Sequence, residues 1–65
     1  MTDAEIAKKW RRTAGLTQRD AAEAWGVTRV QWWRYEAGVS RIPRARRELL
    51  VDALLGRLLG NVVDG

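Results

Sequence analysis

The amino-acid sequence predicts an all-α domain of four to five short helices. Three observations support this prediction. Threonines that can cap helices precede segments with apolar residues at helical spacing, glycines follow these segments, and no segment alternates between apolar and polar residues as a half-buried strand does. The 65 residues contain no internal repeat, and we expect one domain over residues 1–65.

The first helix is predicted over residues 3–14. Thr2 and Glu5 have the spacing of a capping box. In this motif the hydroxyl accepts a hydrogen bond from a backbone N–H three residues later, while the carboxylate reaches back to the capping residue's own N–H. Gly15 follows at the position where a left-handed residue commonly ends a helix.

Two further helices follow in quick succession. Thr17 can cap a helix over residues 18–25, and Thr28 can cap another over residues 29–37. Each is followed by a glycine that can end it. Because only three residues separate the two helices, we expect them to cross steeply rather than to form an antiparallel hairpin.

A fourth helix is predicted over about residues 43–59. Pro43 can open it, because the N–H that proline lacks has no partner at the first helical position. Gly56 is a weak point, at which we expect that the helix can break into a fifth. Apolar residues occupy most sides of this segment: Leu49, Leu50, Val51, Leu54, Leu55, Leu58, Leu59, Val62 and Val63.

Packing within one chain can use only one stripe of these apolar residues. We therefore predict a homodimer in which two copies pair about a two-fold axis. The alternative is that the apolar segment only closes the core of a single chain. The residues expected in the dimer interface are Leu54, Leu55, Leu58, Leu59 and Val62.

Helical spacing divides the third helix into two faces. Trp32, Tyr35 and Glu36 should face the domain, whereas Arg29, Val30, Trp33, Arg34 and Ala37 lie on the opposite side. We expect Trp10, Trp25 and Trp32 to be buried, because three indoles would remove a large area from water in a chain this short.

Positive charge is concentrated in residues 28–47. This segment holds six arginines and one acid, a local charge of +5, within a chain whose net charge is +4. Charge confined to one segment favours a polyanionic partner such as nucleic acid. The alternative is a solvated arginine-rich face.

Several classes of function are not expected. The chain has no cysteine and no histidine, which excludes disulfides and thiolate or imidazole metal sites. Scattered acids, the absence of a glycine-rich phosphate loop and the small size argue against an enzyme, a cofactor and a small-molecule ligand. The start is acidic, unlike a signal peptide, and no apolar run reaches about 20 residues. We therefore expect a cytoplasmic protein without a membrane partner, located at the nucleoid when it binds DNA.

The chain resembles the Cro/C1-type, or Xre-like, helix-turn-helix regulators of phages and bacteria. The resemblance extends from about Ile6 to Pro43 and implies a lambda-repressor-like fold with its helix-turn-helix over about residues 18–37. It rests on Gly15-Leu16-Thr17-Gln18, Ala21-Ala22, Gly26-Val27-Thr28-Arg29 and Arg34-Tyr35-Glu36-Ala37-Gly38.

The resemblance also implies residue roles. Base contacts fall to Arg29, Val30 and Arg34, with Trp33 beside them, and phosphate contacts to Thr17, Gln18, Arg41 and Arg44. Arg11 and Glu36 match a structural ion pair. Trp33 departs from the family, which has a small or polar residue there. This indole can contact DNA, pack against the loop before Pro43, or lie at a dimer contact.

The function implied is that of a repressor that binds double-stranded operator DNA as a homodimer and blocks its own or a neighbouring promoter. Phage Cro proteins and repressors of anti-CRISPR operons are of this type. The alternative is an antitoxin-like module that binds a partner protein through its C-terminal leucines. RNA binding is less favoured, because the major groove of A-form RNA is too narrow for a helix.

Overall fold

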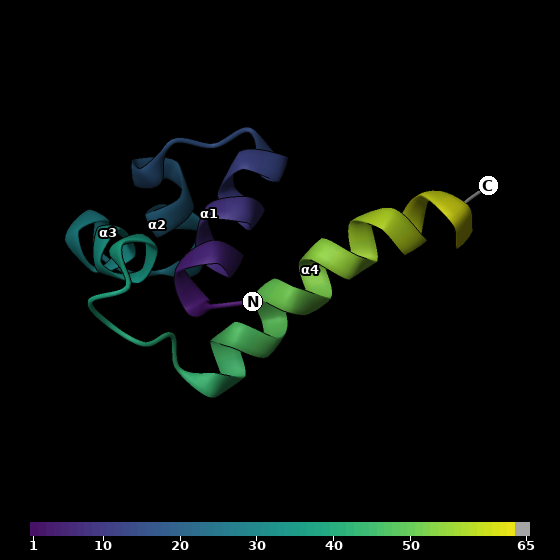
Figure 1. Cartoon of the computed structure of the whole chain (residues 1–65). Coiled ribbons are helices and arrows are strands. Elements are labelled where there is room, and N and C mark those ends of the chain that lie inside the picture. The colour runs from purple at the N-terminus through teal and green to yellow at the C-terminus, as the bar shows by residue number, and fades with distance from the viewer. Residues whose placement is uncertain (64–65) are drawn as a thin grey trace.

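The computed structural model describes the backbone of residues 1–63 and the side chains of residues 1–56. In this part of the chain four helices form, and there is no strand, so the predicted all-α class is confirmed. The helices are α1 (Asp3–Ala14), α2 (Gln18–Trp25), α3 (Arg29–Ala37) and α4 (Arg44–Val63) (Figure 1).

Threonine caps start the first three helices where the sequence predicted them. The hydroxyls of Thr2, Thr17 and Thr28 each accept a hydrogen bond from the backbone N–H three residues later, at 3.2, 3.1 and 3.0 Å. The capping box at Thr2 differs in one bond. The carboxylate of Glu5 accepts from the Thr2 hydroxyl at 3.1 Å, and not from the Thr2 backbone N–H.

The turn between α2 and α3 depends on Gly26. Its φ of 67° lies in the left-handed region, which costs a residue with a Cβ more than it costs glycine. The chain then doubles back, and the N–H of Val27 bonds to the carbonyl oxygen of Ala22 at 3.0 Å. Thr28 caps α3 directly afterwards, so residues 26–28 alone connect α2 to α3.

Helix α4 is longer than predicted. It begins at Arg44, after Pro43, whose carbonyl oxygen accepts the N–H of Arg47 at 2.8 Å. It continues through Gly56 to Val63, so the expected break at Gly56 and the expected end near residue 59 are both wrong. A glycine costs a helix only about 1 kcal/mol, which a run of leucine and arginine on both sides can offset. Among the described residues, no helix has the combined length and apolar character needed to cross a bilayer.

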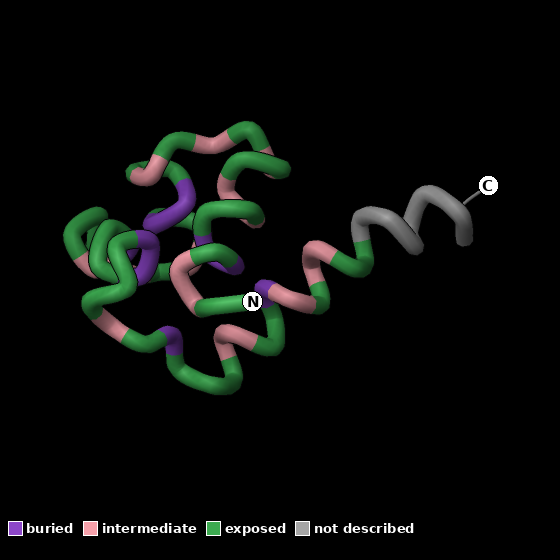
Figure 2. The backbone as a smooth tube through the Cα atoms, viewed as in Figure 1, coloured by how far each residue is buried: buried purple, intermediate pink, exposed green. Residues whose placement is uncertain are grey.

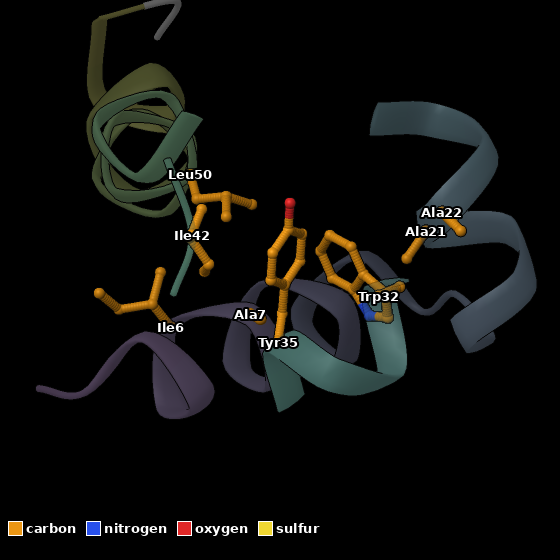
Figure 3. Close-up of a cluster of buried hydrophobic side chains, with 8 residues drawn as sticks. All are labelled: Ile6, Ala7, Ala21, Ala22, Trp32, Tyr35, Ile42 and Leu50. Carbon is orange, nitrogen blue, oxygen red and sulfur yellow. The ribbon is translucent and has the colours of Figure 1, made fainter. Parts of the chain in front are cut away.

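The core forms where α3 packs against α1 and α2, and where α1 packs against α4. Figure 3 shows Trp32 and Tyr35 side by side on α3, between the alanines of α2 and the side chain of Leu50 from α4. Because Ala21 and Ala22 are small, α2 can approach the ring of Trp32 closely. The buried apolar residues are Ile6, Ala7, Ala21, Ala22, Trp32, Tyr35, Ile42 and Leu50.

The tryptophans are less buried than predicted. Trp32 is fully buried, but Trp10 and Trp25 are only partly buried and pack against the edge of the core. The Trp10 ring meets the rings of Trp25 and Trp32 edge to face, at centroid distances of 5.4 and 5.8 Å. A chain this short has too few neighbours to cover three indoles on all sides.

Asp3 joins the start of α1 to the loop before α4 and to the first turn of α4. Its two carboxylate oxygens accept hydrogen bonds from the backbone N–H of Ile42 and from the Nε of Arg47, both at 2.9 Å. Arg46 makes a parallel link from α4 to α2, since its guanidinium donates to the carbonyl oxygen of Trp25. The Asp3 contacts hold the loop over residues 38–43 and the first turn of α4 against the start of α1, and the Arg46 contact holds α4 against the end of α2.

The docking of α4 generates a first prediction. Leu50 is 1% exposed, whereas its neighbour Leu49 is 55% exposed. We expect Leu50→Ala to lower the free energy of unfolding by about 3 kcal/mol, because it removes buried area and leaves a cavity. Leu49→Ala should change it by less than about 0.5 kcal/mol. Urea unfolding followed by circular dichroism measures both, and equal effects would contradict this orientation of α4.

Candidate nucleic-acid interface

One face of α3 is turned entirely to solvent. Its members are arginines and apolar residues, namely Arg29, Val30, Trp33, Arg34 and Ala37, all of them exposed. The opposite face of α3 carries the buried side chains of Trp32, Tyr35 and Glu36. Figure 2 shows buried positions on α3 next to exposed ones. The helix lies at the edge of the molecule, away from the far end of α4 (Figure 1). Its outward face is therefore accessible to a large partner.

The start of α2 shares a surface with the start of α3. Gln18 lines a shallow hollow of about 170 Å³ together with Arg29, Val30 and Trp33. Thr17 precedes Gln18, is exposed, and uses its hydroxyl to cap α2. Four of the eight residues with a predicted DNA contact thus line one surface, and Thr17 adjoins it.

A buried carboxylate holds this surface in place. Glu36 on α3, whose side chain is 4% exposed, accepts hydrogen bonds from Arg11 Nε at 2.6 Å and from Arg11 Nη2 at 3.1 Å. It also accepts from Trp32 Nε1 at 2.5 Å and from Gln18 Nε2 at 3.3 Å. The ion pair of Arg11 and Glu36 is therefore present, and it connects α1, α2 and α3 through one group.

The electrostatics of this group follow from its contacts. Burial alone raises the pKa of Glu36, but the hydrogen bonds from its three partners and the positive charge of Arg11 outweigh burial, and the pKa is lowered. The hydrogen bond to Glu36 raises the pKa of Arg11, against the opposing effect of burial. Both groups are therefore charged at neutral pH.

A second, larger hollow lies between the start of α1 and the loop that leads to α4. Its volume is about 800 Å³, and it shares no lining residue with the first hollow. Arg41 and Arg44 line it and are exposed, and Arg44 Nε lies 3.5 Å from a carboxylate oxygen of Glu48. The two arginines with a predicted phosphate contact therefore lie on one surface. Arg47 also lines it, but its charge is paired there with Asp3.

Sequence reasoning missed three features of these surfaces. It did not foresee that Gln18 and Trp32 would both bond to Glu36, nor that Arg47 would bond to Asp3 across 44 positions of the chain. The spacing of four residues between Trp32 and Glu36 on one helix could have indicated the second of these contacts. The other two depend on tertiary packing and have no local signal.

Three groups of apolar residues on α4 bear on the predicted dimer. Leu54 is partly buried and packs against the core of its own chain. The sequence predicted that one apolar stripe of this helix would pack within the chain. Leu49 and Leu55 are exposed by 55% and 54%. The other residues of the predicted interface, Leu58, Leu59 and Val62, lie outside the residues whose side chains the structure describes.

Comparison with known proteins gives one finding. A family model described as a helix-turn-helix domain matches residues 5–59, which include most of α1, all of α2 and α3, and most of α4. No curated protein and no solved structure matches the chain.

The lowered pKa of Glu36 generates a prediction about acid stability. A carboxyl group whose pKa falls on folding stabilises the fold above its unfolded pKa, which is about 4.3. This stabilisation is lost as the pH falls through the folded pKa. We expect the free energy of unfolding to decrease below about pH 4.3, and Glu36→Gln to remove much of that decrease while lowering stability at pH 7.

Glu23→Gln is the matched control, because the side chain of Glu23 is 70% exposed in its ion pair with Arg19. Urea unfolding between neutral and acidic pH measures all three proteins. The same acid dependence in wild type and Glu36→Gln would show that the Glu36 contacts do not supply it.

Proposed function

Because the chain belongs to the helix-turn-helix domain family, we propose that it is a sequence-specific repressor of transcription that binds double-stranded DNA as a homodimer. Residues 1–65 then form one DNA-binding domain, with α2 and α3 as the helix-turn-helix. The observation that carries this proposal is the outward face of α3. It presents Arg29 and Arg34 on a helix whose inward face is fixed by Glu36.

Base recognition is assigned to the outward face of α3. The major groove of B-form DNA, about 12 Å wide, admits one α-helix. Arg34 can donate two hydrogen bonds to O6 and N7 of a guanine, and Arg29 can do the same from the first turn. Val30 and Trp33 lie between them on the sequence and on the same face.

Phosphate contacts are assigned to the start of α2 and to the second hollow. The N-terminus of a helix favours an anion. The amide nitrogen of Gln18 carries two hydrogens, so it can donate one to Glu36 and the other to a phosphate. Thr17 precedes Gln18 in the chain. Arg41, in the loop, and Arg44, at the start of α4, would contact phosphates of the DNA backbone.

The dimer is assigned to α4. Leu55 exposes about half of its surface, and the helix extends beyond the body formed by α1, α2 and α3 (Figure 1). Pairing about a two-fold axis would place two α3 helices about one turn of DNA apart, roughly 34 Å, and requires a palindromic operator. The proposed interface comprises Leu55, Leu58, Leu59 and Val62, together with the part of Leu54 that its own core leaves uncovered.

Repression would follow from occupancy. A dimer bound across a promoter excludes the polymerase, and no catalytic step, cofactor or small ligand takes part. The proposed target is the chain's own promoter or a neighbouring one, as for a phage Cro protein or a repressor of an anti-CRISPR operon. The place of action would be the DNA of the nucleoid, in the cytoplasm.

The exposed leucines of α4 also support a second candidate, an antitoxin-like module that binds another protein. The two candidates differ in the mass of the purified protein in solution. A homodimer by sedimentation supports the repressor. A monomer that forms no dimer on operator DNA would favour the second candidate.

Selection of bound duplexes from a random pool at physiological salt tests the proposal most broadly. We expect a palindromic consensus with half-sites centred about 10 base pairs apart. Selected duplexes should bind at least about a thousandfold more tightly than random duplex DNA. Recovery of no consensus would contradict sequence-specific binding, and an asymmetric consensus would contradict the dimer.

The arginines give a residue-level prediction. Arg34→Ala should weaken operator binding by about 1–3 kcal/mol and relax base preference at one position of each half-site. Arg44→Ala is the matched control: it should weaken binding to all duplexes alike and reduce the slope of log affinity against log salt by about one. Titrations of operator and random duplexes at several salt concentrations measure both effects. Equal weakening of all sequences by Arg34→Ala would make Arg34 a phosphate contact.

A further inference from the structure

Two large apolar side chains lie on the cationic face of α3. Val30 is 59% exposed and Trp33 is 52% exposed, and neither contributes to the buried core of the domain. A helix at the surface of a globular protein needs only one apolar side, and α3 already has that side in Trp32 and Tyr35. Apolar area grouped on the opposite side, within a polar surface, is typical of a binding site.

These side chains form part of a shaped feature. Val30 and Trp33 line the hollow of about 170 Å³ whose other lining residues are Arg29 and Gln18. The hollow thus combines an isopropyl group and an indole ring with a guanidinium and a carboxamide. Its occupant should be a small apolar group attached to a polar edge, because both kinds of surface lie within a few ångströms of each other.

The major groove of DNA contains one group of this kind. Thymine carries a methyl group at C5, beside the O4 oxygen that accepts hydrogen bonds. Cytosine, adenine and guanine carry no methyl group there. A phosphate does not suit the apolar part of the hollow. Pairing with the α3 helix of a second copy does not suit it either, since this would bring the arginines of the two helices together.

We infer that Val30 and Trp33 determine specificity by enclosing the C5-methyl group of a thymine, with Arg29 at the polar edge of the same base step. This inference rests on the proposed function, because it requires α3 to lie in the major groove. It assigns to Trp33 a direct part in choosing the operator, and it excludes the loop before Pro43 and the dimer interface as the partners of this indole.

Deoxyuridine tests the inference, because it differs from thymidine only by the missing methyl group. Each thymine of the selected operator is replaced in turn, and affinity is measured by fluorescence anisotropy. We expect one replacement in a half-site to weaken binding about fourfold, the effect of about 0.8 kcal/mol for one methyl-sized group. The other replacements should leave the affinity unchanged within about twofold.

Variants assign the effect to the hollow. Trp33→Ala and Val30→Ala should each bind the thymine and deoxyuridine operators with affinities that differ by less than about twofold. Arg34→Ala is the matched control, because Arg34 does not line the hollow. It should bind both operators more weakly and retain the fourfold ratio. Circular dichroism checks that each variant is folded.

The outcomes separate the inference from the proposed function. Wild-type protein that selects an operator but tolerates deoxyuridine at every position overturns the inference and leaves the proposed function standing. An operator that requires no thymine does the same. A persistent fourfold ratio in Trp33→Ala and Val30→Ala also overturns it. Protein that prefers no duplex sequence overturns both.

Discussion

The fold is organised around the buried carboxylate of Glu36. A carboxylate withdrawn from water is strongly destabilising unless its oxygens are bonded and its charge is paired. Arg11 supplies the pairing charge and two hydrogen bonds, while Trp32 and Gln18 supply one each. Because these donors belong to three helices, satisfying one anion fixes how α1, α2 and α3 sit against each other.

The outward face of α3 follows from this constraint. Glu36, Trp32 and Tyr35 fix the inward side of the helix, and the period of 3.6 residues then turns Arg29, Val30, Trp33 and Arg34 away from the domain. Stability and the proposed DNA recognition are thereby divided between the two sides of a helix of nine residues. Gln18 belongs to both, since its amide bonds to Glu36 while its backbone starts the helix that is proposed to approach a phosphate.

Local chemistry made much of the fold predictable. A threonine before each of the first three helices and a glycine after it satisfy backbone groups within a few residues, so their bounds could be derived from the sequence. The end of α4 could not, because Gly56 weakens a helix without stopping it. The contacts of Asp3 with Ile42 and Arg47 join distant segments and have no local signal. Trp10 and Trp25 are only partly buried because the domain is small, and their exposure could not be derived from the composition alone.

The central claim, that the side of α3 opposite Glu36 is the surface that meets DNA, can be tested with the tryptophan side chains. Each indole N–H gives its own signal in a proton–nitrogen correlation spectrum, and Trp32 and Trp33 are adjacent residues on opposite sides of α3. On addition of a selected duplex, the indole N–H signal of Trp33 should shift strongly. The signal of Trp32, whose indole N–H donates to Glu36, should stay in place. An unmoved Trp33 signal at saturating duplex would contradict the account.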